Sequence, residues 1–149
     1  MENGKLPPSA LQAIPFGRLA KGDPARSWLA MRYFIGRRKN LWIRPGGPNS
    51  SYRTYQKQVE FYNAYRNGSG PLAARPGTSN HGWGRAVDAA DPQYQAAIRT
   101  VGHLFGWGIQ GGQLSSDAMS ESWHCTFVKM TPKARYWYAR YRLARRKKK

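Results

Sequence analysis

Two short segments of the chain hold histidines and acids whose types and spacing could bind a metal ion. The first segment, SNHGWGRAVD, contains His81 and Asp88, and the second, ESWH, contains Glu121 and His124. Two histidines and one carboxylate, with a fourth position left for water, are a common ligand set of catalytic zinc sites. His81, Asp88 and His124 are therefore the candidate ligands of one zinc ion, with His103 as the competing histidine.

Glu121 has the side chain of a general base, but its position requires a break in regular structure. It lies three residues before His124, which on a regular strand would place the two side chains on opposite faces. A loop or bulge before the strand would bring Glu121 to the attacking water, from which it would accept a proton. The third histidine, His103, falls on the polar side of a predicted helix and is expected to face solvent.

The second segment is expected to open a strand over residues 123–128. Because successive side chains of a strand point to opposite faces, His124 would face a cleft while Trp123 anchors the strand in the core. Cys125 shares the face of Trp123, which predicts a small buried side chain rather than a nucleophile.

The elements expected around these segments are helices mixed with short strands. Helices are predicted over residues 23–39, 54–66, 91–105 and from 131 onward, and strands over 85–89, 107–109 and 123–128. Asp-Pro or Thr-Pro pairs stand at three of the helix starts, where proline suits the first turn. This mixture predicts a single α+β domain whose small antiparallel sheet carries the zinc site and is flanked by helices.

Two of the predicted helices are rich in aromatic residues. In the helix over 54–66, Tyr55, Val59 and Tyr62 are spaced i, i+4 and i+7, which predicts a stripe that faces the core. We interpret the aromatic residues of the last helix in the same way, as core rather than as a platform for sugars.

Composition limits the classes of protein to consider. With 149 residues, the chain suits one compact domain, and its one cysteine excludes internal disulfides and multi-cysteine zinc sites. No apolar run approaches the roughly 18 residues of a membrane span. The 25 Lys and Arg residues against 7 Asp and Glu residues give a net charge of +18, which favours polyanionic partners. The sign of the charge does not choose among nucleic acid, cell wall and membrane.

Three motifs in this sequence resemble the zinc signature of the VanY-type D-alanyl-D-alanine carboxypeptidases. They are SYRTYQKQ at residues 51–58, SNHGWGRAVD at 79–88 and ESWH at 121–124. The motifs follow the family's order, and the resemblance spans roughly residues 25–130. That family shares a superfamily with the phage L-alanyl-D-glutamate endopeptidases and the hedgehog signalling domain, so the resemblance implies a hedgehog-like fold.

The resemblance also implies roles for individual residues. It implies that His81, Asp88 and His124 bind zinc and that Glu121 is the catalytic base. It implies that Arg53 stabilises the carbonyl oxyanion or positions the substrate, and a fixed cation near developing negative charge does lower a barrier. Ser79 and Gln58 would contact the substrate peptide or its carboxylate. Family members often carry an aromatic residue directly after the histidine that corresponds to His124, whereas this chain has Cys125-Thr126. This difference affects the expected substrate subsite and not the zinc ligands.

The chain divides into three stretches on this interpretation. Residues 1–22, with three prolines, are expected to form an irregular arm, and residues 23–139 the zinc peptidase domain. Residues 140–149 contain seven basic side chains and no acid, which predicts a solvated basic tail. This tail would attract anionic envelope polymers or lipid headgroups.

The function implied is hydrolysis of peptidoglycan stem peptides by a monomeric zinc enzyme. The first residues lack a basic region followed by an apolar one, so we expect no secretory signal and a cytoplasmic protein until release to the cell wall. This expectation favours a phage-type endolysin, an L-alanyl-D-glutamate endopeptidase, over a resident D-alanyl-D-alanine carboxypeptidase. The alternatives are a non-catalytic basic nucleic-acid-binding protein and a hedgehog-like zinc protein without turnover, against which Glu121 argues.

Overall fold

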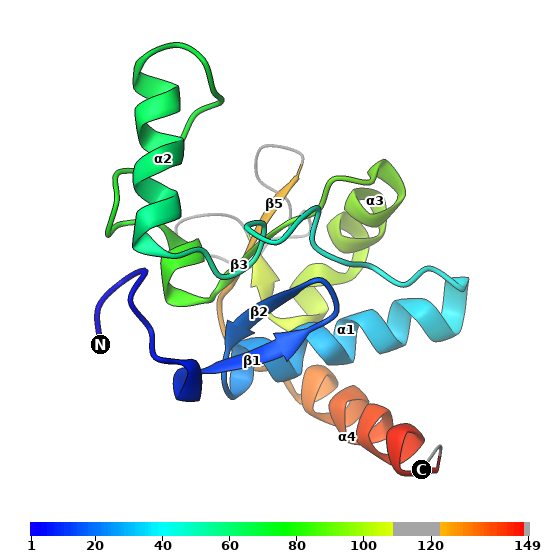
Figure 1. The fold of residues 1–149 in the computed structure, drawn as a ribbon. Coiled ribbons are helices and arrows are strands. Elements are labelled where there is room, and N and C mark those ends of the chain that lie inside the picture. The colour runs from blue at the N-terminus through cyan, green and yellow to red at the C-terminus, as the bar shows by residue number, and fades with distance from the viewer. Residues whose placement is uncertain (109–122, 148–149) are drawn as a thin grey trace.

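The computed structural model describes residues 1–108 and 123–147. In these ranges the chain forms, in order, η1 (Pro8–Ala10), β1 (Leu11–Ile14), β2 (Gly17–Ala20), α1 (Asp23–Lys39), α2 (Tyr55–Arg66), η2 (Asn80–Trp83), β3 (Ala86–Asp88), α3 (Pro92–Val101), η3 (Gly102–Phe105), β4 (Trp107–Gly108), β5 (His124–Phe127) and α4 (Pro132–Lys147) (Figure 1). The elements labelled η are short 3-10 helices. Within the two described ranges, no helix combines the length and the apolar character needed to cross a bilayer.

A three-stranded antiparallel sheet lies at the centre of the fold. Its strand order is β3-β5-β4, so β5 lies between the other two. The register pairs Asp88 with His124 and Ala86 with Thr126. Two of the predicted zinc ligands are therefore neighbours across adjacent strands. The helices flank this sheet, which confirms the predicted α+β class.

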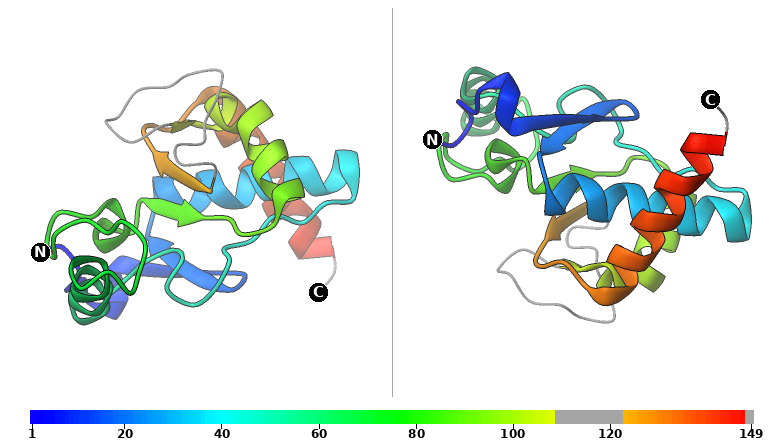
Figure 2. Two further views of the ribbon diagram at one scale, coloured as in Figure 1. Left: turned by 90° about the horizontal axis from the view of Figure 1, so that it is seen from above. Right: turned by 90° about the horizontal axis from the view of Figure 1, so that it is seen from below.

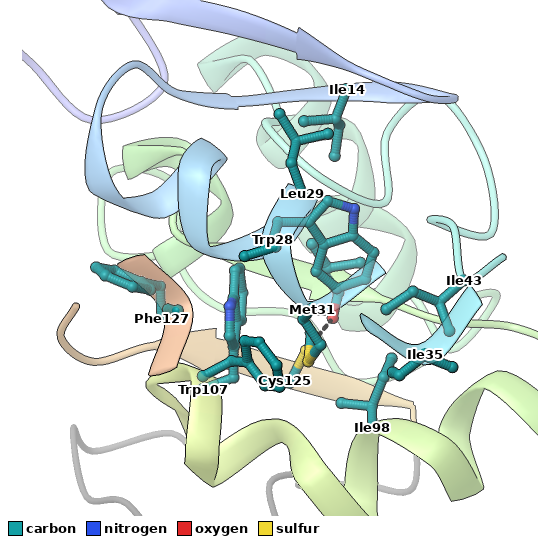
Figure 3. Packing of buried hydrophobic residues seen from close by; sticks show 14 of the residues in the cluster. Ile14, Trp28, Leu29, Met31, Ile35, Ile43, Ile98, Trp107, Cys125 and Phe127 are labelled. Carbon is teal, nitrogen blue, oxygen red and sulfur yellow. Dashed lines mark hydrogen bonds between the residues drawn. The ribbon is translucent and has the colours of Figure 1, made fainter. Parts of the chain in front are cut away.

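The helix α1 forms the main wall of the core. Trp28, Met31 and Ile35 are buried on one side of it, as their spacing predicted. In Figure 3, Trp28 and Met31 pack beside Trp107 of β4 and Cys125 of β5. The rings of Trp28 and Trp107 meet edge to face, with centroids 5.4 Å apart.

Residues 1–22 were expected to form an irregular arm, and this prediction is wrong. The strands β1 and β2 form an antiparallel hairpin whose Ile14 and Leu19 join the core. The turn places Phe16 at a φ of 68°, a left-handed conformation that bulky residues rarely adopt. A sequence without Gly or Asn at this position gives no hairpin signal.

The first residues also contact the segment that carries His81. The Asn3 amide donates to the Ser79 carbonyl at 2.7 Å, and the Gly4 N–H donates to the Gly82 carbonyl at 2.8 Å. A Cβ atom at Gly82 would overlap the Asn3 side chain. Glycine at this position therefore allows the first residues of the chain to lie against η2.

The helix α2 begins as predicted but does not face the core. The Thr54 side chain caps it by accepting a hydrogen bond from the Lys57 N–H. Gln58 is its only buried residue, and the predicted stripe of Tyr55, Val59 and Tyr62 is exposed or half-buried. Figure 1 shows α2 standing away from the central sheet. The core assignment for this stripe is wrong.

The predicted helix over residues 91–105 is divided into two. Asp91 caps α3 as expected, but the chain continues after Val101 as the 3-10 helix η3. A 3-10 helix has fewer residues per turn, so the side chains after Val101 change direction. His103 is consequently half-buried rather than facing solvent, and Leu104 is 39% exposed rather than in the core.

The helix α4 extends through most of the predicted basic tail. Residues 140–147 are helical, so this part of the tail is not a separate charge run. On its inner side Trp137, Tyr138 and Tyr141 pack against the core, as predicted for these aromatic residues. Figure 2 shows α4 crossing α1 on the outside of the molecule.

Candidate metal centre

The three predicted ligands come from two strand ends and one 3-10 helix. Asp88 ends β3, His124 begins β5, and His81 lies in η2. One ligand atom from each residue lies within 4.8 Å of the other two. Asp88 Oδ1 is 3.2 Å from His81 Nε2 and 2.8 Å from His124 Nδ1. Ligands in a tetrahedral zinc site are about 3.3 Å apart, so this donor set fits one zinc ion.

The protein orients both imidazole rings through the nitrogen that faces away from the centre. His81 Nδ1 lies 2.8 Å from the Ser51 carbonyl oxygen. A carbonyl only accepts, so Nδ1 carries a hydrogen, and Nε2, which faces Asp88, is the nitrogen whose proton a metal ion would replace. His124 Nε2 lies 3.1 Å from Thr126 Oγ1, which leaves Nδ1 directed at Asp88. Such outer contacts fix the tautomer and the direction of metal-binding histidines.

Asp88 is held in the charged form that a metal ligand needs. Burial alone would raise the pKa of Asp88. Hydrogen bonds from His124 and His81, together with their charges, outweigh burial and hold that pKa well below its usual range. Ionised carboxylates are the form that binds metal, so Asp88 needs no deprotonation at neutral pH.

Arg53 places a fixed cation beside the ligands. Its Nη2 lies 3.5 Å from Asp88 Oδ2, its Nη1 donates to Gln58 Oε1 at 3.0 Å, and its Nε donates to the Asn49 carbonyl at 3.0 Å. Its guanidinium lies over the Phe61 ring. Burial lowers the pKa of Arg53 and Asp88 partly opposes this, yet an arginine in a protein stays charged.

The structure also brings Gln58 and Ser79 to this centre, where both line the same pocket. Gln58 accepts from Arg53 and donates through Nε2 to the Ala74 carbonyl at 2.7 Å. The Ser79 hydroxyl accepts the His81 N–H at 3.1 Å and so caps η2. These contacts position Arg53 and His81. The expected substrate contacts of Gln58 and Ser79 stay predictions.

A pocket of about 380 Å³ opens above the candidate ligands. Its apolar wall comes from α2 and the following loop and includes Phe61, Ala64, Pro71, Leu72, Ala73 and Ala74. Trp123 closes another side. This tryptophan was expected in the core but is 42% exposed, because β5 begins only at His124 and Trp123 belongs to the preceding turn.

The remaining site predictions have different outcomes. Glu121 lies outside the described residues, so its assignment as the base stays a prediction. Cys125 is fully buried on the opposite face of β5, and burial raises the pKa of its thiol, as expected for an unreactive side chain. Sequence reasoning missed Ser51, Asn49 and the role of Thr126. Backbone carbonyls carry no sequence signal, and the Thr126 contact depends on ring orientation.

Comparison with known proteins gives one family and a set of similar folds. The family model described as VanY, D-alanyl-D-alanine carboxypeptidase, matches residues 46–140. A search of curated proteins finds no match.

Among solved structures, the vancomycin-resistance D,D-pentapeptidase VanY with Zn(II) has a TM-score of 0.57 and 18% identity, over 88% of each chain. VanYB in complex with D-alanine-D-alanine has a TM-score of 0.58 and 19% identity, over 93% of this chain and 89% of that one. The LD-carboxypeptidase LdcB has a TM-score of 0.50 and 19% identity, over 84% and 78%. At these identities the structures show a shared fold.

Proposed function

The chain belongs to the VanY family of D-alanyl-D-alanine carboxypeptidases, and from that premise we propose that it hydrolyses peptide bonds in the stem peptides of peptidoglycan. The match to the family model confirms the resemblance that the three motifs indicate. It identifies the protein as a peptidase, and the similar VanY structure with Zn(II) supports zinc as its metal. The observation that carries the proposal is the convergence of His81, Asp88 and His124 beside Arg53 at the floor of a pocket.

The proposed mechanism assigns a task to each group around the pocket. Zinc, when bound by the three ligands, polarises the scissile carbonyl and makes water a stronger nucleophile. The Arg53 guanidinium is held by its other acceptors in a position to stabilise negative charge on the carbonyl oxygen. Glu121 would accept a proton from the attacking water and pass it to the leaving amine.

The apolar walls of the pocket favour a substrate with small apolar side chains. Phe61 and Leu72 on one side and Trp123 on another are 37%, 68% and 42% exposed. Each therefore offers apolar surface that a bound peptide would remove from water. Alanine methyl groups, which are frequent in stem peptides, suit such a surface.

For the bond cleaved, we propose the L-alanyl-D-glutamate bond, and with it a phage-type endolysin that acts at the wall after release from the cytoplasm. The net charge of +18 supports action at an anionic envelope, and an enzyme that opens the cross-linked wall has to cut within the stem peptide rather than trim its free end. The alternative is cleavage of the terminal D-alanyl-D-alanine bond, which the family description supports.

Synthetic stem peptides distinguish the two bonds. One pentapeptide ends in a free D-alanyl-D-alanine carboxylate, and a matched peptide carries a C-terminal amide. An endopeptidase releases L-alanine from both peptides, whereas a carboxypeptidase that requires the free terminus removes D-alanine only from the first. Mass spectrometry of the products, with purified sacculi as a third substrate, identifies the bond. Zinc-loaded protein that cleaves none of the three would refute the hydrolase proposal.

A further inference from the structure

The outer side of α4 carries surface residues that the peptidase site does not use. On its inner side Ala134 is buried and the aromatic residues pack against the core. Tyr136, Ala139 and Leu143 lie on the opposite side, spaced i, i+3 and i+7, and so follow one line along the helix. Tyr136 and Leu143 are each 55% exposed. We call these three residues the α4 ridge.

Exposed cations lie along both sides of the α4 ridge. Arg135 and Arg142, seven residues apart, follow one side, and Arg140 and Lys147, also seven apart, follow the other. The α4 sequence contains no acidic residue that could neutralise them. Arg140 donates instead to the Tyr136 hydroxyl at 3.0 Å and lies over the Tyr136 and Trp137 rings, so among the described residues it pairs with no carboxylate.

This arrangement fits a flat anionic surface with an apolar layer beneath its charges. We propose that the α4 ridge docks on a bilayer of anionic phospholipid. Tyr136 and Leu143 would enter the headgroup region while the two rows of cations contact the phosphates on either side. A linear polyanion such as duplex DNA would also attract the cations, but it has no apolar layer that would remove the exposed Leu143 from water.

The docked orientation keeps the pocket accessible. The pocket wall is formed by α2 and the loop that follows it, and α2 and α4 lie at opposite ends of the molecule in all three views (Figures 1 and 2). A protein held on a bilayer through α4 would therefore present the candidate metal centre away from the lipid. This inference does not depend on the proposed peptidase activity.

Vesicle co-sedimentation at physiological salt tests the proposal, with phosphatidylcholine vesicles that contain or lack phosphatidylglycerol. The double variant Arg142→Gln/Lys147→Gln removes one cation from each row. The control Arg66→Gln/Arg75→Gln removes two exposed cations from α2 and the loop that follows it, at the opposite end of the molecule from α4 (Figure 1), and gives the same net charge. We expect about 30-fold weaker binding to anionic vesicles for the first variant and less than a threefold change for the control.

A second variant separates a bilayer from a polyanion. Leu143→Ser should weaken binding to anionic vesicles about tenfold and leave binding to duplex DNA unchanged. Thermal unfolding of each variant checks that the fold is intact. Equal losses in the two double variants, or vesicle binding that Leu143→Ser does not change, would overturn the proposal.

Discussion

The contact between Thr126 and His124 allows a sharp test of the proposed centre. Thr126 is 5% exposed, and its hydroxyl lies 3.1 Å from the ring nitrogen of His124 that faces away from Asp88. Thr126→Val replaces this hydroxyl with a methyl group of similar size. The change should leave the core packed while the His124 ring loses a contact that fixes its direction and tautomer.

Loss of such an outer contact lowers metal affinity about 10- to 100-fold, or about 1.4 to 2.7 kcal/mol. Competition with a chromophoric zinc chelator measures this change directly. The control Thr126→Ser keeps the hydroxyl and should bind zinc within about threefold of the unchanged protein. Thermal unfolding of the metal-free proteins separates lost affinity from lost stability. If Thr126→Val and Thr126→Ser bind zinc equally well, the outer contact has no role in the centre.

Three further predictions follow from the same geometry. Gln58→Leu removes an acceptor from Arg53 and should lower kcat/KM on a stem peptide about 10- to 100-fold, with zinc content unchanged; a proportional loss of zinc would contradict a role through Arg53. Glu121→Ala should abolish cleavage while zinc stays bound, whereas His81→Ala should lower zinc occupancy, both measured by elemental analysis beside a hydrolysis assay. The Cys125 thiol, whose pKa is raised by burial, should react with Ellman's reagent only after unfolding; rapid labelling of the folded protein would show that it is accessible.

The ligand set could be predicted from the sequence because its residues are rare and closely grouped. His81 and Asp88 share one short motif, and the strand assigned around His124 was correct within one residue. The antiparallel pairing of β3 with β5 then follows from the need to bring these side chains together. The family motifs added Arg53, whose position beside Asp88 no local periodicity indicates.

Other features depended on contacts that the sequence does not encode locally. Apolar spacing in α2 identified a helix, but such spacing cannot distinguish a stripe that faces the core from one that is left exposed. Trp123 was assigned to the core by strand alternation, which does not apply to a residue in the turn before the strand. The hairpin escaped prediction because Phe16 occupies a backbone conformation usually reserved for glycine.

The hydrogen bonds of Asn3 and Gly4 to η2 have a practical consequence for anyone who produces this protein. Gly4 also accepts a hydrogen bond from the Tyr55 N–H at 2.9 Å, so these few residues fasten the turn of His81 to the start of α2. Removing these residues to obtain a shorter recombinant protein would remove the hydrogen bonds that join η2 to the start of α2. An affinity tag joined directly to the first residue would place bulk within a few residues of it, so a spacer is advisable in any expression plasmid.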